Sequence, residues 1–286
     1  MKIAYLTAYL GKEFMERYGK GKKFALSGPL KSLGIARGMM SAGHEVVIYS
    51  PGVTTCNMKI PAFVEYENYP EGKLTIKYCD ILSKRRCDPI NQLRIAKCLK
   101  SEHRKEQFDV VVYYNITLAA AILVKSLDNC LKVLEYEDNI FNKALVGDRN
   151  NFVWIKRKLY NRIISRTDGV MAVCNGLMLP EIQHRVLTPG IINEEVVNNV
   201  STRVNKLKEG KLVTIILTGG IHYSKGGDLL VKAMKYIKTP CVVKVYGNCN
   251  LDDNFKQLIK EVPSIHKFEF NGYMPVSYTH LTLPTI

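Results

Sequence analysis

Apolar segments with the composition of β-strands alternate with helical patterns along almost the whole chain. Strand-like segments include KIAYLTAY at 2–9, HEVVIYS at 44–50 and DVVVYY at 109–114. The segment 29–42 begins with a proline, which suits the first turn of a helix, and stops before Gly43, which suits a helix C-terminus. This alternation is typical of parallel strands joined by crossover helices, so the sequence predicts an α/β fold.

The βα pattern occurs in two series, which predicts two doubly wound, Rossmann-like domains. The first series covers residues 1–195 and includes a polar loop at 10–28 after the first strand. The polar stretch 196–211 is interpreted as a linker, and a second series with three strands covers 212–275. Three strands are few for a doubly wound sheet, so we expect the second domain to be incomplete.

The chain is strongly basic, with a formal net charge of +15 and basic groups at 19–23, 83–86 and 155–162. Such an excess fits nucleic acid, an anionic membrane surface, a phosphorylated small molecule or a merely solvated basic surface. The sequence contains no aromatic RNA-binding signature, zinc finger or glycine-rich RNA-binding tract. We therefore expect no nucleic-acid partner.

Cysteine spacing and hydropathy bear on the compartment. The eight cysteines are scattered, without a CxxC pair or a cluster with histidine at zinc-binding spacing, which predicts free thiols. The longest apolar runs fall far short of the roughly 20 residues that span a bilayer, and the N-terminus lacks a signal-peptide cleavage pattern. We expect a cytoplasmic protein, with a peripheral position at the inner face of the membrane as a further hypothesis.

Loops at the carboxyl ends of the strands are the candidate ligand sites of an open α/β sheet. Gly28 precedes a helix start, where backbone amides and the helix dipole favour phosphate; a plain turn glycine is the alternative. In the loop TGGIHYSKGG, Gly219 and Gly220 would expose amides and Lys225 adds a positive charge, which suits a diphosphate better than a flexible connection. Gly247 ends the strand VVKVYG, where a tight turn explains it equally well.

Three carboxylates gather at the end of the strand KVLEYE. Glu135 and Glu137 lie on one face by two-residue alternation, and both are costly to bury without partners. We therefore expect Asp138, and with it Glu137, to face a ligand; helix capping by Asp138 is the alternative. A metal site is not expected, because no histidine joins these carboxylates at ligand spacing.

The order of these motifs resembles the GT-B glycosyltransferases, and specifically the retaining glycosyltransferase family 4. SGPLKSLGIARGMMSAGHEVVIYSPG, which starts at Ser27, is similar to the family's glycine loop, first helix and second strand. IILTGGIHYSKGGDLLVKAM resembles the family's GrlxxeKGxdlLieA loop, and VKVYGNC and FEFNGYMP follow in the same order. The resemblance covers 1–275, although Ile221 replaces the family's arginine and Glu137 stands where the family often has histidine.

The resemblance implies transfer of a sugar from a nucleotide-sugar donor to a hydroxyl acceptor with retained configuration. The acceptor would be a polysaccharide or a lipid-linked glycan held by the N-terminal domain, with Asp138 and Glu137 as catalytic or acceptor-side residues. No metal or other cofactor would be needed to balance the departing diphosphate. The residues implied at the donor and its diphosphate are Gly28, Gly219, Gly220, Lys225 and Gly247. A non-catalytic protein that binds a nucleotide or a sugar is the alternative.

The closing segment VSYTHLTLPT at 276–285 has neither helical nor strand periodicity. It matches the translation of a transposase sequencing adaptor, so we interpret 276–286 as a non-native tail and exclude it from fold reasoning. The paired glutamates with which the resembled family grips the donor lie beyond Pro275. The sequence thus predicts a C-terminally truncated fragment that is inactive by itself.

Overall fold

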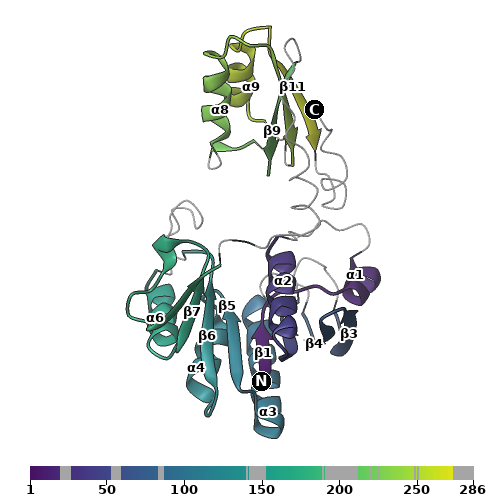
Figure 1. The fold of residues 1–286 in the computed structure, drawn as a ribbon, viewed down its shortest axis with the longest axis vertical. Helices are drawn as coiled ribbons and strands as arrows, with labels where there is room; N and C mark the ends of the chain where they lie inside the picture. Colours follow the sequence, from purple (N-terminus) through teal and green to yellow (C-terminus); the bar gives the residue numbers. More distant parts are fainter. Residues whose placement is uncertain are drawn as a thin grey trace. The chain divides into compact units, whose positions relative to one another are not determined.

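The chain divides into two compact units, Met1–Ile191 and Ile192–Ile286, which are considered separately below (Figure 1). The computed structural model describes residues 1–19, 27–52, 59–82, 87–139, 141, 153–188, 190, 212–219, 221–223, 226–247, 249 and 251–272. The predicted linker at 196–211 and the predicted tail at 276–286 lie outside the described residues.

Unit 1 is built on an eight-stranded sheet with the order β3-β4-β2-β1-β5-β6-β7-β8. Neighbouring strands are parallel except β3 and β4, which form a hairpin. The strands are β1 (Lys2–Leu6), β2 (Glu45–Ser50), β3 (Phe63–Tyr69), β4 (Gly72–Tyr78), β5 (Val110–Tyr114), β6 (Leu131–Tyr136), β7 (Gly169–Ala172) and β8 (His184–Leu187).

Helices cover both faces of this sheet. On one face, α2 packs over β1 with a core that includes Tyr5, Ile48 and Ala36. On the other face, α3, α4 and α6 enclose a second core that includes Leu99 and Leu123 (Figure 1). The helices of unit 1 are α1 (Lys12–Tyr18), α2 (Ser27–Ser41), α3 (Asp88–Glu106), α4 (Leu118–Ser126), α6 (Val153–Ile164) and the short 3-10 helix η4 (Asn175–Leu177).

The strand order reverses between β1 and β5. The chain leaves β1 toward α2 on one face, whereas it leaves β5 toward α4 on the opposite face. The two following loops therefore diverge at the carboxyl ends of β1 and β5. In open α/β sheets such a switch point is where ligands bind.

The expected polar loop at 10–28 contains a helix that the sequence prediction missed. The backbone amides of Lys12 and Glu13 donate to the carboxylates of Glu67 (2.8 Å) and Glu65 (2.6 Å), which supply the cap at the N-terminus of α1. Phe14 of this helix is fully buried against the β3–β4 hairpin. A local pattern search could not detect α1, because its cap comes from a distant strand.

Two strand boundaries also differ from the prediction. The first strand ends at Leu6 rather than at residue 9. The next residue, Thr7, still donates its amide to the Tyr49 carbonyl of β2 at 3.2 Å, and its hydroxyl lies 2.7 Å from that of Ser32 on α2. The composition of HRVLTPG at 184–190 also predicts a strand, and in the structure this strand ends at Leu187. The loop after β1 is therefore fastened to α2, close to the switch point.

Unit 2 contains a parallel three-stranded sheet with the order β11-β10-β9. Val231, Val243 and Phe255 form the centre of its core, between the sheet and two helices. The elements are β9 (Val213–Thr218), α8 (Gly227–Met234), β10 (Cys241–Tyr246), α9 (Asp253–Lys260) and β11 (Lys267–Gly272). The predicted strand–helix alternation is confirmed; the last strand, expected over 266–270, covers Lys267–Gly272.

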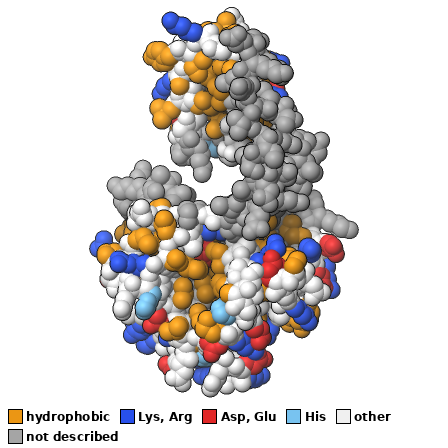
Figure 2. Space-filling view, in the orientation of Figure 1, with side chains coloured by type: hydrophobic (Ala, Val, Ile, Leu, Met, Phe, Trp, Pro, Cys, Tyr) orange, Lys and Arg blue, Asp and Glu red, His pale blue; other side chains and the backbone are white. Residues whose placement is uncertain are grey.

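Two further properties of the described residues concern their hydrophobic side chains. None of their helices combines the length and the apolar character that crossing a bilayer requires. Figure 2 shows hydrophobic side chains across the middle of one face of unit 1, beside α2. On this face of β6 and β7 the side chains of Val133 and Met171 are half-buried.

Candidate functional site

The switch point of unit 1 brings together side chains from four elements. The ends of β1, β5 and β6 contribute Tyr5, Tyr114 and Glu135, and the first turns of α2 contribute Gly28 and Lys31. These residues are far apart in the sequence, yet hydrogen bonds and ion pairs connect most of them. We name this group the switch-point cluster and extend it below to the residues that follow β5 and β6.

Glu135 is the most deeply buried member of the switch-point cluster. Its side chain is fully inaccessible to solvent and accepts a hydrogen bond from the Tyr5 hydroxyl. Its second oxygen, Oε1, lies 3.8 Å from the Lys31 ammonium and has no hydrogen-bond partner within the described residues. Burial of this carboxylate is thus compensated by Tyr5 and, in part, by Lys31.

Glu137 shares the same lysine. It forms an ion pair with Lys31 and accepts a hydrogen bond of 2.8 Å from the Tyr114 hydroxyl. Both glutamates therefore have partners for their charge. Gly28 lies against Tyr114, because a Cβ at this position would come within 3.2 Å of the tyrosine oxygen. The helix begins at Ser27, so Gly28 belongs to its first turn rather than to the loop before it.

Asn115 holds the chain at the ends of β5 and β6. Its φ is +56°, a left-handed conformation that asparagine tolerates better than most residues. Its side-chain oxygen accepts hydrogen bonds from the backbone amides of Glu137 (2.8 Å) and Asp138 (3.1 Å), and its Nδ2 donates to the Asp138 carboxylate at 3.3 Å. Asp138 itself is exposed, so it is the carboxylate of this cluster that a ligand can reach directly.

The buried carboxyl of Glu135 is poised to titrate near neutral pH. Burial, with a contribution from the nearby Glu137 charge, raises the pKa of Glu135 to about 7, against the opposing effects of Tyr5 and Lys31. Groups with a pKa near the working pH are frequent in functional sites. Since Glu135 is inaccessible, we assign it a positioning role toward Lys31 rather than contact with a substrate.

Unit 2 presents a separate glycine-rich edge after β9. Gly219 follows the strand with a φ of +93°, and Gly226 precedes α8 with a φ of +73°. The Gly227 amide donates to the His222 carbonyl at 2.9 Å. A Cβ on Gly227 would lie 2.7 Å from the Ile221 side chain, so glycine is required for this close approach.

The first turn of α8 has no side-chain cap from its N-cap residue. Gly226 offers no side chain to the helix, and the Gly227 amide is bonded to the His222 carbonyl. Asp228 in the same turn forms an ion pair of 3.0 Å with Lys232. Gly247 ends β10 with a φ of +119°, and its amide donates to the Gly272 carbonyl at 2.6 Å.

The structure brings some predicted residues together and leaves others undescribed. Glu137 and Asp138 lie in one cluster with Gly28 in unit 1, whereas Gly219 and Gly247 follow adjacent strands in unit 2. Gly220 and Lys225 lie outside the described residues. The sequence interpretation missed four members of the switch-point cluster, namely Tyr5, Lys31, Tyr114 and Asn115. Of these, Asn115 could have been found, because it directly follows a parallel strand at the edge where ligands bind.

Comparison with protein-family models and with curated protein sequences gives no match. Solved structures, however, share the fold. Sucrose-phosphate synthase from Thermosynechococcus elongatus matches with a TM-score of 0.60 and 12% identity, over 98% of this chain and 72% of that chain. Anabaena Alr3699/HepE in complex with UDP matches with a TM-score of 0.53 and 11% identity, over 96% and 70%. A glycosyltransferase from Rickettsia africae matches with a TM-score of 0.51 and 18% identity, over 96% and 68%. The predicted GT-B class with Rossmann-like units is confirmed.

Proposed function

We propose that the protein is a glycosyltransferase of the family 4 type, which moves a sugar from a nucleotide-sugar donor to a hydroxyl group with retention of configuration. The observation that carries the proposal is the GT-B fold, which the chain shares with a structure determined in complex with UDP. The glycine-rich approach to the N-terminus of α8, with positive φ at Gly219 and Gly226, supports binding of a diphosphate in unit 2. The acceptor in this proposal is a polysaccharide or a lipid-linked glycan.

The proposed chemistry divides between the two units. The bond between the sugar's anomeric carbon and the diphosphate breaks, a new bond to the acceptor oxygen forms, and the proton of the acceptor hydroxyl passes to the departing diphosphate. Lys225, with the amides near Gly219 and Gly220, would stabilise the charge on the departing diphosphate, so this scheme requires no metal ion. Gly28 and Gly247 would allow close approach of the donor.

Asp138 is proposed as the acceptor-side residue, because it is exposed at the switch point and accepts a hydrogen bond from Asn115. It would accept a hydrogen bond from the acceptor hydroxyl and orient it for attack. Glu137 is already bound by Lys31 and Tyr114, so its role would be to hold this edge in place. Replacing Asp138 by Asn should slow sugar transfer while leaving nucleotide affinity unchanged.

Calorimetric titration with UDP, GDP and ADP tests donor binding. We expect one of them to bind, and Lys225→Gln to weaken that binding by roughly tenfold or more, because a charge-assisted contact is lost. The matched control is Lys238→Gln, which removes an exposed lysine before β10, at the opposite edge of the sheet. Absence of binding by all three nucleotides, or an equal loss in both variants, would contradict the proposal.

Transfer assays separate an enzyme from a protein that merely binds nucleotides or sugars. A glycosyltransferase releases free nucleoside diphosphate and forms a glycosidic product, whose anomeric configuration is read by NMR. If the reaction proceeds with retention, the product has the same anomeric configuration as the donor sugar. Tight donor binding without product, in any acceptor mixture tested, would favour the non-catalytic alternative.

We also propose peripheral association of the protein with an anionic membrane surface, supported by the net charge of +15. Sedimentation with phosphatidylglycerol vesicles at low salt, but not with phosphatidylcholine vesicles, is the expected result. A protein that stays in the supernatant with both vesicle types would refute this part of the proposal.

A further inference from the structure

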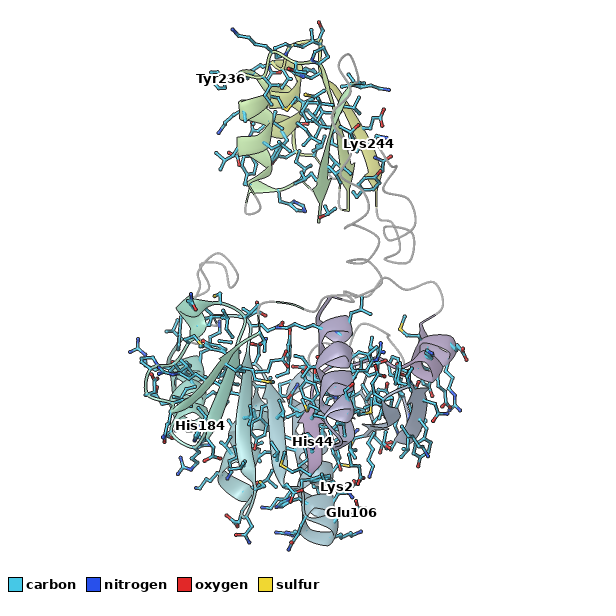
Figure 3. The ribbon with its side chains drawn as sticks, viewed as in Figure 1. Lys2, His44, Glu106, His184, Tyr236 and Lys244 are labelled. Carbon is cyan, nitrogen blue, oxygen red and sulfur yellow. The ribbon has the colours of Figure 1, made fainter. Side chains whose placement is uncertain are left out.

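A cavity of about 760 Å3 lies in unit 1, away from the switch-point cluster. It is lined by residues of α3, α4 and α6 near their C-terminal ends, where the chain turns back to enter β5, β6 and β7. The end of α3 is marked by Glu106, which pairs with Lys2 at the start of β1; Figure 3 shows this pair at the lower end of unit 1. The cavity therefore lies near the amino ends of the strands, whereas the switch-point cluster lies at their carboxyl ends.

The charge around this cavity is strongly positive. Lys100 and Arg104 come from α3, Lys125 from α4 and Arg162 from α6, whereas Asp128 is the only carboxylate among the lining residues. None of the four cations forms an ion pair or a side-chain hydrogen bond with another described residue. Four like charges held around one hollow repel one another unless an anion enters.

Helix dipoles explain part of this arrangement but leave an excess of positive charge. Each helix C-terminus carries roughly half a negative charge, so the ends of α3, α4 and α6 favour nearby cations. Together with Asp128, the three termini offset part of the four positive charges, and more than one charge remains uncompensated. A group with two negative charges, such as a phosphate monoester, would balance this remainder.

The cavity also offers a hydroxyl without a partner. The Ser126 Oγ is shielded from solvent and has no hydrogen-bond partner within the described residues, although Ser126 lines the cavity. A shielded hydroxyl in this position is costly unless a ligand or a water satisfies it. A change of the Ser126 rotamer that turns the hydroxyl toward the cavity would let it donate to an anion bound among the four cations.

Two hydrogen bonds of His103 join elements that surround the cavity. The His103 Nδ1 accepts a hydrogen bond of 3.1 Å from the Phe108 amide, so the ring proton resides on Nε2. That nitrogen donates to the Asp128 carbonyl at 2.8 Å and ties α3 to the loop after α4. Three of the four cations, Lys100, Arg104 and Lys125, are therefore carried by two helices whose ends are joined by this bond.

We propose that this cavity binds a phosphate-bearing ligand through Lys100, Arg104, Lys125 and Arg162, with Ser126 donating a hydrogen bond. Arginine and lysine in combination suit phosphate, because arginine offers a fork of donors and lysine a compact charge. The volume falls within the range of about 300–1,000 Å3 that is typical of small-molecule pockets. The phosphate is therefore carried by a larger group, either a free phosphorylated compound or a phospholipid headgroup.

Two variants of the full chain and one matched control test the proposal. Lys125→Gln/Arg162→Gln removes two cations that line the cavity, and Ser126→Ala removes the hydroxyl. The control, Arg157→Gln/Lys158→Gln, removes the same two charge types from exposed positions on α6 that do not line the cavity. Inorganic pyrophosphate is titrated by calorimetry at low salt, and vesicles of phosphatidylcholine with phosphatidic acid are tested by sedimentation.

The double variant should lose at least about tenfold in affinity for pyrophosphate or for the phosphatidic acid vesicles, and Ser126→Ala about fivefold to tenfold. Ser126→Ala should not lower thermal stability, because its hydroxyl has no partner in the protein. If the double variant loses binding only to the vesicles, the phosphate belongs to a lipid headgroup. If it loses binding to pyrophosphate, the phosphate belongs to a free compound. Equal losses in the control, no binding of either probe, or pyrophosphate binding lost only in Lys225→Gln would overturn the proposal.

Discussion

Replacement of Glu135 by glutamine removes a carboxyl that should titrate far from its ordinary pKa. In the folded protein, burial raises the pKa of Glu135 from its ordinary value of 4.5 to about 7. Glutamine keeps the shape of the side chain and can still accept the hydrogen bond from Tyr5. The change therefore removes the titration and leaves most of the packing intact.

The sign of the effect follows from proton binding. Below pH 4.5 the carboxyl is protonated in both the folded and the unfolded chain, so pH has no effect through this group. Between pH 4.5 and about 7 the unfolded chain loses the proton while the folded one keeps it, so the wild-type protein loses stability as pH rises. The pKa difference corresponds to about 3 kcal/mol, which is fully lost above pH 7.

The assay is urea denaturation followed by the fluorescence of Trp154, the only tryptophan, which lies on α6 of unit 1. The unfolding free energy of Glu135→Gln minus that of the wild type should rise by about 3 kcal/mol between pH 4.5 and pH 7.5. Glu45→Gln removes a carboxylate with a 63% exposed side chain, and it serves as the control. A difference for Glu135→Gln that stays constant over this range would refute the assignment of a raised pKa to this group.

Two further predictions use the same fluorescence assay. Gly11→Ala should destabilise unit 1 by about 1–3 kcal/mol, because the added Cβ overlaps the Glu65 carboxylate that caps α1. Gly38 lies at an exposed position in the interior of α2, with open space for a Cβ, so Gly38→Ala should instead stabilise unit 1 by about 0.5–1 kcal/mol. If Gly11→Ala and Gly38→Ala change the stability in the same direction, this reasoning is contradicted. Asn115→Ala should cost about 2–3 kcal/mol, because alanine disfavours the φ of +56° and cannot accept the Glu137 amide. Asn115→Gly tolerates the positive φ and should therefore cost less stability than Asn115→Ala. A loss of stability equal to or larger than that of Asn115→Ala would contradict the contribution of backbone strain.

Much of the fold was accessible to pattern reasoning. The strands β2, β5 and β10 are apolar runs, and the helices between them carry local signals such as Gly43 after α2. These signals depend on residues close together in the chain. Burial on both faces makes parallel strands recognisable without any knowledge of their neighbours.

The candidate site was accessible only in part. The candidate residues Gly28, Gly219 and Asp138 follow from the rule that ligands bind at carboxyl strand ends. The partners of the carboxylates did not follow from it, because Lys31 lies more than 100 residues from Glu135 and Glu137. The basic cavity was equally hidden, since its four cations lie on three helices.

The sequence by itself determined the α/β alternation, the glycines at the strand ends and the positive charge, because each is a property of local composition and spacing. Only the tertiary structure decided that Glu65 and Glu67 would cap a helix whose first residues lie 52 and 55 positions away. It also decided that one lysine would serve both Glu135 and Glu137. A buried charge must find a partner in space, and the strand order at the switch point, rather than distance along the chain, determines which partners are near.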